Sequence, residues 1–548
     1  MQQLEKAAKE AGKMLKWWQE RVVYQIWPRS FQDSNGDGIG DLQGIIAHLD
    51  ELKDLGVGII WLSPVYPSPN ADYGYDISDY TGINPEFGTM EDMDQLIAEA
   101  AKRDIKIVMD LVINHTSDQH PWFQSSREKN SPYRDYYIWR PGRGKRPPNN
   151  WGSFFGGPAW EYDPHSGEYY LHLFAKNQPD LNYRNPKVLA EVKDILRFWL
   201  NKGIAGFRCD VINIIWKSSL ENGRWRPALK GLEHYLSQEG CHRILQELRR
   251  EIFDHYDCFT VGETVFVTTQ MARDFLGQGE LDMVFSFEHM GADELLIKWF
   301  KRRFSPKRLA RALTKWQLEV PWNANYLENH DQPRSVSRFG HEGEFWEQSA
   351  KLLCVLLLTL KGTPFIYQGQ EIGMTNFDYT SMEQIRDIES HNVYQLAKRL
   401  GFPPGLRWKL IKASSRDNAR TPVQWNGGPN AGFTTGKPWI DVNSNYTKIN
   451  MESQLNDPNS IRSFYKKMIA LRRESPVLKA GDFEPVAIEE SLFAFRRKLE
   501  RESLLVLLNF TQAAVAAPYR GQVVISNYDR TSYGGRLEPF EAVVLREN

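Results

Sequence analysis

Three acidic residues that each follow a short apolar stretch are the side chains of this sequence best suited to catalysis. Asp210 follows residues 204–209, Glu263 follows 259–262, and Asp331 lies shortly after 324–327. If these stretches are parallel strands, their carboxyl ends meet at one face, where functional groups of barrel enzymes gather. Two carboxyls about 5–5.5 Å apart, one a nucleophile and the other an acid, are the equipment of a retaining glycosidase.

The neighbours of the first two carboxyls predict different roles for them. Arg208 is two residues before Asp210, so on an extended chain both side chains point the same way. We expect the guanidinium to keep the pKa of Asp210 low, as a nucleophile requires. Apolar neighbours, among them Val265 and Phe266, are expected to raise the pKa of Glu263, as a general acid requires. A buried structural ion pair is the simpler alternative for Arg208 and Asp210 alone.

Further polar residues follow predicted strands and fit the same site. His115 lies after residues 105–112, and His330 directly precedes Asp331. Asp331 is suited to stabilising the positive charge that develops on a sugar ring. Either histidine alone is as well explained by a structural hydrogen bond. Carboxylates at three predicted strand ends, taken together, favour a catalytic site.

The elements that must position these residues alternate between strand and helix. Helical segments, such as 91–103 and 188–202, separate many of the short apolar strands, and this alternation predicts an α/β fold, a closed (β/α)8 TIM barrel. No Gly-x-Gly-x-x-Gly follows the first strand, so a dinucleotide-binding fold is unsupported. The eight predicted strands are 22–27, 57–62, 105–112, 204–209, 259–262, 283–287, 324–327 and 365–367.

Two gaps in the alternation and a change of pattern near the end predict the domain organisation. The Trp-, Tyr-, Pro- and Gly-rich segment after the third strand predicts a small inserted domain, and the short strands after Pro476 predict a C-terminal antiparallel β-domain, a β-sandwich. The predicted parts are a helical extension (1–16), the first part of the barrel (17–113), the inserted domain B (114–180), the second part of the barrel (181–475, with a loop-rich insertion at about 373–441) and the C-terminal domain (476–548).

Composition excludes several other classes of protein. The 68 basic and 69 acidic residues give a formal net charge of −1, which argues against nucleic acid or a membrane surface as a partner. The charged N-terminus lacks the apolar core of a signal peptide, and the longest apolar run, 352–360, is too short to span a bilayer. The four cysteines show no metal-ligand spacing and indicate a reducing compartment. We expect a cytoplasmic monomer without an obligate protein partner, acting on a small oligosaccharide.

Eight segments, in order along the chain, carry a resemblance to a known family. The sequence resembles the α-amylase family (glycoside hydrolase family 13), and within it the oligo-1,6-glucosidase and dextran glucosidase branch. The segments are VVYQIWPRSFQDSNGDGIGDL (22–42), DYGYDISDY (72–80), DLVINHTSD (110–118), QPDLN (178–182), GFRCDVIN (206–213), VGET (261–264), ENHDQPRSVSRFG (328–340) and RDNARTPVQW (416–425).

The resemblance implies a role for each residue of the site. It implies that Asp210 is the nucleophile, Glu263 the general acid and base, and Asp331 the stabiliser of the transition state. It also implies that Asp72 and Arg420 bind the non-reducing end and close the pocket, so that the enzyme acts from chain ends. The residues that it places around the cleaved glucose are Tyr75, His115, Arg208 and His330.

The loop between residues 33 and 41 has the oxygen spacing of a calcium loop, with a glycine at its sixth position. It departs from an EF-hand because position 12 is Gly44 instead of glutamate. The resemblance implies a structural Ca²⁺, with Mg²⁺ as the alternative ion and no organic cofactor. The implied ligands are Asp33, Asn35, Asp37, Ile39 and Asp41.

Linkage preference depends mainly on Val211, beside the nucleophile. Relatives that act on α-1,6 bonds typically carry valine at this position, which favours an α-1,6-glucosidase that acts on isomalto-oligosaccharides. One such contact is worth only about 10–200-fold in discrimination. Trehalose-6-phosphate hydrolase, α-1,4-glucosidase and sucrose isomerase therefore remain as alternatives. A non-catalytic barrel, of the kind found as ancillary subunits of transporters, is a remote one because this chain keeps all three carboxylates.

Overall fold

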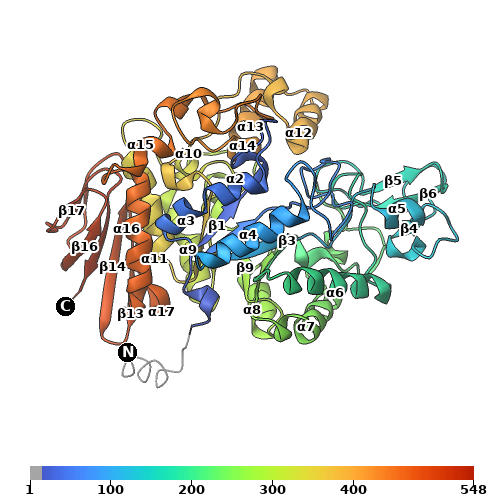
Figure 1. The fold of residues 1–548 in the computed structure, drawn as a ribbon, viewed down its shortest axis with the longest axis horizontal. Helices are drawn as coiled ribbons and strands as arrows, with labels where there is room; N and C mark the ends of the chain where they lie inside the picture. Colours follow the sequence, from blue (N-terminus) through green and yellow to red (C-terminus); the bar gives the residue numbers. More distant parts are fainter. Residues whose placement is uncertain (1–14, 296, 548) are drawn as a thin grey trace.

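The centre of the computed structural model, which describes residues 15–295 and 297–547, is a parallel eight-stranded barrel (Figure 1). Its strand order is β10-β11-β1-β2-β3-β7-β8-β9, and β9 contacts β10, so that the sheet returns on itself. The predicted (β/α)8 fold is confirmed. The barrel strands are β1 (Val23–Ile26), β2 (Ile59–Leu62), β3 (Lys106–Leu111), β7 (Gly206–Cys209), β8 (Phe259–Glu263), β9 (Met283–Phe285), β10 (Ala324–Asn325) and β11 (Thr363–Tyr367).

Helices surround the barrel, and local sequence explains where several of them begin. Thr89 and Asp92 form a capping box at the start of α4, and Asn185 and Ser305 cap α6 and α9, each of which has proline at its first position. The helices between barrel strands are α2 (Leu42–Ala47), α3 (Leu49–Leu55), α4 (Met90–Lys102), α6 (Pro186–Asn201), α7 (Glu239–Glu251), α8 (Thr269–Gly277), α9 (Pro306–Glu319), α10 (Ser335–Phe339) and α11 (Trp346–Thr359).

The register of the parallel strands determines which polar residues meet. Asp110 on β3 lies opposite Arg208 on β7, and Arg208 lies opposite Val261 on β8. Glu263, two residues beyond Val261, therefore ends its strand at the same edge as Asp210. The carboxyl ends of three neighbouring strands thus bring four charged residues together.

The segment between β3 and α6 contains a small antiparallel sheet of its own. Its strand order is β4-β6-β5, and Figure 1 shows it with α5 at the end of the molecule opposite the C-terminal strands. Trp151, Trp160 and Leu171 of this segment belong to a separate apolar cluster, whereas Trp139 and Tyr170 pack in the main core. The elements are α5 (Pro121–Ser126), β4 (Trp139–Arg140), β5 (Trp160–Asp163) and β6 (Glu168–Leu171).

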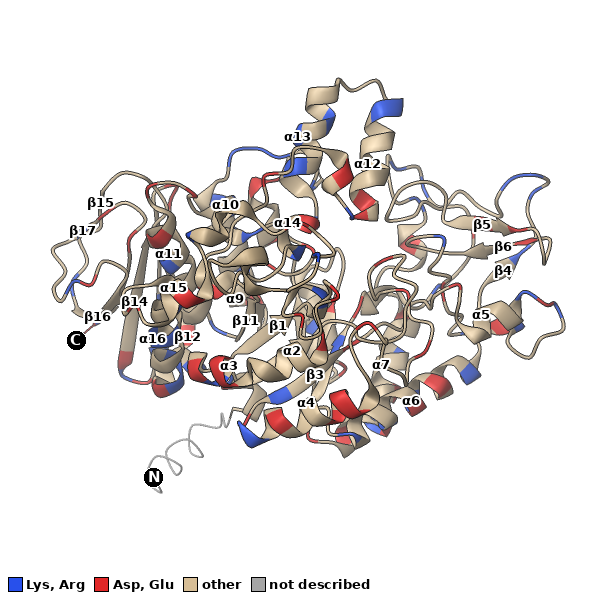
Figure 2. Cartoon of the chain, turned by 45° about the horizontal axis from the view of Figure 1, so that its top comes forward, with Lys and Arg blue, Asp and Glu red and all other residues tan. Residues whose placement is uncertain are grey.

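Three helices, α12 to α14, alternate with irregular segments in the predicted loop-rich insertion after β11. Two of its helices, α12 and α13, form a hairpin that projects from the body of the molecule (Figure 2). The elements are α12 (Ile388–Arg399), α13 (Pro404–Ser414), α14 (Asp417–Arg420) and α15 (Met451–Leu455), followed by α16 (Ile461–Glu474) and α17 (Pro476–Ala480).

The C-terminal part is antiparallel, as predicted, and packs against the barrel through α9 and α11. Its five-stranded sheet has the order β12-β13-β14-β18-β16, and β15 pairs with β17. Residues 349–359 of α11 are buried on every side because the helix contacts α16, β14 and β18, which explains the longest apolar run of the sequence. The strands are β12 (Asp482–Ile488), β13 (Leu492–Leu499), β14 (Glu502–Asn509), β15 (Val515–Ala516), β16 (Gln522–Ser526), β17 (Arg536–Leu537) and β18 (Ala542–Arg546).

The helical extension expected for residues 1–16 lies, except for its last two residues, outside the described part of the chain. Within residues 15–295 and 297–547, no helix combines the length and the apolar character needed to cross a bilayer.

Candidate active site

Arg208 is the centre of the polar cluster at the strand ends. Its Nη1 donates to Asp210 Oδ1 at 2.5 Å and to Asp110 Oδ1 at 2.6 Å, and its Nη2 donates to Glu263. The guanidinium lies over the ring of Trp61, 5.4 Å from its centroid, and the residue is 2% exposed. Three carboxyls therefore share one buried cation.

Burial with an excess of negative charge raises the pKa of all three carboxyls. Burial raises the pKa of Glu263 to about 7, against the effect of Arg208, and the charges of Asp210 and Asp331 raise it further. Burial likewise raises the pKa of Asp210 to about 6 and that of Asp110 to about 6, in both cases against Arg208. The expectation of a low pKa for Asp210 is therefore wrong, because desolvation outweighs the guanidinium. The expectation that the pKa of Glu263 is raised agrees with the structure.

Asp331 has the opposite electrostatic setting. Its Oδ1 accepts from Arg420 Nη2 at 2.8 Å and from Arg416 Nη1 at 3.4 Å, and its Oδ2 lies 3.1 Å from His330 Nε2. Burial acts to raise the pKa of Asp331, but His330 and the two arginines hold it well below its usual value. Asp331 is thus ionised at neutral pH, in contrast to Asp210 and Glu263, whose pKa values are raised.

His330 lies between two aromatic rings and is fixed by both ring nitrogens. Tyr75 stacks on it at 5.3 Å between centroids, and Trp27 stacks at 5.2 Å. Nδ1 lies 2.7 Å from Gln25 Nε2, and Nε2 lies 2.8 Å from the Tyr75 hydroxyl. Burial lowers the pKa of His330, so a neutral imidazole is favoured.

His115 belongs to a second group on the other side of Tyr75. Its Nε2 lies 3.0 Å from the Tyr75 carbonyl oxygen and 3.1 Å from Gln178 Nε2. Gln178 Nε2 also donates to Asp72 Oδ2 at 3.3 Å. Burial lowers the pKa of His115. The structure therefore brings Asp72, Tyr75 and both histidines into one wall of the site.

Asp72 pairs with Arg416, whereas Arg420, which the resemblance places with Asp72 at the non-reducing end, pairs with Asp331. Arg416 Nη2 lies 3.0 Å from Asp72 Oδ1 and 2.7 Å from Asp387 Oδ1. Its guanidinium also lies over the ring of Phe155 from the inserted segment, at 5.3 Å. Arg416 therefore joins residues from three loops, so that both insertions meet over the site.

Arg420 is completely buried beneath Asp331. Its Nε donates to the His330 carbonyl oxygen at 3.1 Å, and its guanidinium lies over the ring of Trp27 at 4.8 Å. With its bond to Asp331, Arg420 holds the backbone and the side chain of neighbouring site residues. This geometry suits positioning of Asp331 better than direct contact with a sugar.

Val211 has an unusual backbone and a buried side chain. Its φ of 37° and ψ of 38° are left-handed, which is strained for a β-branched residue. The side chain is 5% exposed and packs in the apolar cluster with Trp151 and Leu171. Val211 thus packs among apolar residues directly after Asp210, and its role in linkage preference stays a prediction.

The loop 33–41 has oxygen donors of the type that Ca²⁺ prefers, but its described side chains are bonded within the protein. Asp33 accepts backbone N–H groups of Asn35, Gly36 and Gly38, and Asp41 accepts those of Ser34 and Gly44. Over the described residues, no three His, Cys, Asp or Glu side chains are grouped to hold a metal ion. The donor chemistry fits calcium, and the ion stays a prediction.

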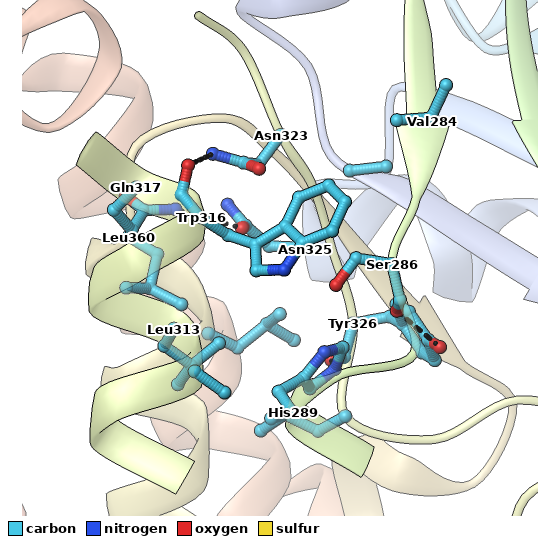
Figure 3. A pocket seen from close by; sticks show the side chains of 14 residues that line it. Val284, Ser286, His289, Leu313, Trp316, Gln317, Asn323, Asn325, Tyr326 and Leu360 are labelled. Carbon is cyan, nitrogen blue, oxygen red and sulfur yellow. Dashed lines mark hydrogen bonds between the residues drawn. The ribbon is translucent and has the colours of Figure 1, made fainter. Parts of the chain in front are cut away.

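A separate small cavity of about 20 Å³ lies between α9 and the ends of β9 and β10 (Figure 3). Ser286, His289 and Tyr326 line one side of it, and Leu313 and Trp316 line the other. Its size corresponds to about one water molecule. It is lined by none of Asp210, Glu263 and Asp331, so the candidate site is defined by the charged cluster and not by this cavity.

Sequence reasoning missed Asp110, Gln178 and Arg416. All three lie in segments that the family resemblance marks, at 110–118, 178–182 and 416–425. Asp110 carried a usable signal, since it is a charged residue near the end of a predicted apolar strand, as Arg208 is. Arg416 carried no such signal. Arg416 and Arg420 are four residues apart in one loop, and the sequence does not show which of them lies nearer to Asp72.

Comparisons with known proteins agree with this geometry. A family model described as "Alpha amylase, catalytic domain" matches residues 25–481. An oligo-1,6-glucosidase of Parageobacillus thermoglucosidasius is 50% identical, over 97% of this chain and 99% of that protein. A trehalose-6-phosphate hydrolase of Bacillus subtilis (strain 168) is 44% identical, over 97% and 98%. The crystal structure of an isomaltulose synthase from Klebsiella sp. LX3 superposes with a TM-score of 0.95 at 42% identity, over 97% of this chain and 100% of that one.

Proposed function

The chain belongs to the alpha-amylase family of glycoside hydrolases, and from that premise we propose that it is a retaining, exo-acting α-glucosidase. We propose that it hydrolyses α-1,6-glucosidic bonds at the non-reducing end of isomalto-oligosaccharides. The observation that carries the proposal is the arrangement of Asp210 and Glu263 on one guanidinium, that of Arg208. The oligo-1,6-glucosidase names of relatives 43–50% identical over nearly their full length support the linkage.

The first step is attack by Asp210 on the anomeric carbon of the terminal glucose. Asp210 must be ionised, and its pKa of about 6 allows this at neutral pH. Glu263, with a pKa of about 7, keeps its proton over part of the same range and donates it to the glycosidic oxygen. The bond to the leaving sugar breaks, and a glucosyl ester forms on Asp210.

The second step reverses the role of Glu263. Its carboxylate takes a proton from water, the water attacks the anomeric carbon, and the ester to Asp210 breaks with net retention. Asp210 and Glu263 bond the same guanidinium, that of Arg208, which supports the short separation of carboxyls that a retaining enzyme needs. Asp331, ionised throughout, stabilises the positive charge on the ring in both steps.

The closed end of the site supports action from chain ends. Arg416 pairs with Asp72 and Asp387 and contacts Phe155, so that the two insertions meet beyond the glucose position. A polysaccharide chain cannot pass through such a pocket. We propose that Asp72 and Arg416 bind the hydroxyls of the non-reducing end, since a charge-assisted pair suits vicinal hydroxyls.

Initial rates on isomaltose, maltose, trehalose-6-phosphate and sucrose test the proposal. We expect isomaltose to be hydrolysed fastest. The arginines of the site, Arg208, Arg416 and Arg420, are each paired with carboxylates, which disfavours a phosphorylated sugar. Faster turnover of maltose would refute the linkage. Asp210→Asn should abolish turnover with the fold intact, and near-normal activity of this variant would refute the mechanism.

We further propose that the protein acts as a monomer in the cytoplasm with a structural Ca²⁺ in the loop 33–41. The four cysteines, Cys209, Cys241, Cys258 and Cys354, are free thiols, which supports a reducing compartment. Light scattering at working concentration tests the monomer, and calorimetric titration with Ca²⁺ tests the metal.

A further inference from the structure

Phe266 is a large aromatic residue that is exposed close to the catalytic acid. It lies three residues after Glu263, and 56% of its surface is accessible to solvent. Its φ is 52°, in the left-handed region that bulky residues avoid. An unfavourable backbone that presents an apolar ring to water is a feature of functional sites more than of folding.

The backbone before Phe266 is fixed to the segment that follows the nucleophile. Asn213, which is buried and three residues after Asp210, bonds both backbone groups of Val265. Val265 N donates to Asn213 Oδ1 at 3.0 Å, and Asn213 Nδ2 donates to the Val265 carbonyl oxygen at 2.9 Å. The position of Phe266 relative to both catalytic carboxyls is therefore determined by a rigid contact.

Phe266 is also the outermost ring of an aromatic wall, formed with Phe154 and Phe174, that leads to the glucose site. Phe266 stacks on Phe154, with centroids 6.4 Å apart and planes at 18°. Phe154 stacks on Phe174 at 5.0 Å and 12°, and Phe174 lies 5.3 Å from His115. The wall thus continues from a residue of the glucose site to the solvent.

We propose that Phe266, supported by Phe154, is a specificity-determining residue on which the leaving-group sugars of the oligosaccharide stack. This inference rests on the proposed function. The C–H faces of a pyranose are apolar, and placing one on an exposed ring removes apolar surface of both from water. Because the ring is held before substrate arrives, little conformational freedom is lost on binding.

The test compares a substrate that has leaving-group sugars with one that has none. Isomaltotriose has such sugars, whereas α-D-glucosyl fluoride releases only fluoride. In Phe266→Ala we expect kcat/KM for isomaltotriose to fall by about fivefold to tenfold, with the fluoride unchanged. Phe266→Tyr should retain the wild-type ratio of the two substrates. Calorimetry in the inactive Asp210→Asn background should show the same loss of isomaltotriose affinity.

Tyr162→Ala is the matched control, because Tyr162 is an aromatic residue of the inserted segment that is 49% exposed and not part of the wall. An equal or larger loss on the fluoride, or no loss on either substrate, would overturn the inference. If the wild-type protein prefers maltotriose, the proposed linkage fails, and the same ratio measured with maltotriose still decides the role of Phe266.

Discussion

Replacing Asp110 by asparagine should move the whole pH profile of hydrolysis to lower pH. Activity requires Asp210 ionised and Glu263 protonated, with pKa values of about 6 and about 7. The profile of kcat/KM is therefore expected to be a narrow bell, and its two limbs belong to the coupled pair. Asp110 is a third negative charge on the same guanidinium. Removing it makes ionisation of both catalytic carboxyls easier, so both limbs move in the same direction.

The size of the shift follows from the geometry around Arg208. Asp110 Oδ1 and Asp210 Oδ1 bond the same nitrogen at 2.6 and 2.5 Å, so they are at most about 5 Å apart. At an effective dielectric constant of about 20, two charges at that distance interact by about 3 kcal/mol, or about 2 pKa units. The pKa of Asp110 is itself about 6, so the residue is only partly ionised near the acid limb. We therefore expect a shift of about 1 pH unit.

The assay is kcat/KM for isomaltose between pH 4.5 and 8.5 at constant ionic strength, compared with wild type. Asparagine keeps an oxygen that accepts from Trp61 Nε1, which bonds Asp110 at 2.9 Å. Asp282→Asn is the control, because Asp282 is a buried carboxyl paired with Arg249 just before β9, at the opposite end of the barrel. Limbs that stay in place, or that move to higher pH, would refute the electrostatic reasoning.

Three other perturbations test different parts of the structure. Arg416→Met leaves Asp72 and Asp387 buried without their cation, so we expect a loss of about 3–5 kcal/mol in the free energy of unfolding by urea and a raised KM for isomaltose. Lys412→Met, at an exposed pair, should change neither quantity. An Arg416→Met variant with unaltered stability and KM would contradict the pairing. Val211→Thr buries a hydroxyl in an apolar cluster, so we expect a loss of about 1–3 kcal/mol in unfolding free energy with the isomaltose preference kept; reversed preference at unchanged stability would place the side chain in the cleft. Chelation of Ca²⁺ should lower Tm by about 2–3 °C, as expected for loss of an ion present at about 100 times its Kd; an unchanged Tm in calorimetry would remove the metal from the loop 33–41.

The eight barrel strands were predictable because each is a short apolar stretch between helical segments, and burial on both faces leaves little alternative. The position of Asp210 and Glu263 at strand ends was predictable for a related reason. A charged residue such as Asp210 that directly follows a buried strand must lie where the strand leaves the core, at the open end of a barrel. Their residue types and their strand ends come from local sequence, and no long-range information is needed to find them.

Contacts between distant loops were not predictable in the same way. Asp72 and Arg416 are 344 positions apart, and nothing local distinguishes Arg416 from Arg420 as the partner. The predicted low pKa of Asp210 was wrong for a physical reason. The neighbouring arginine can be read from the sequence, but the depth of burial cannot. The left-handed backbone of Val211, directly after β7, was not predictable, because a valine gives no sign of such a turn.

The burial of α11 from residue 349 to its end means that the barrel depends on the C-terminal sheet to cover this helix. Arg497 on β13 donates to the carbonyl oxygen of Thr359, the last residue of α11, and Arg472 on α16 donates to that of Leu358. A shortened protein that ended with α16 would expose the leucines of α11 and leave the end of that helix without one of its donors. Barrel and sheet therefore form one cooperative unit, in which heat is expected to abolish hydrolysis and melt the C-terminal strands in a single transition.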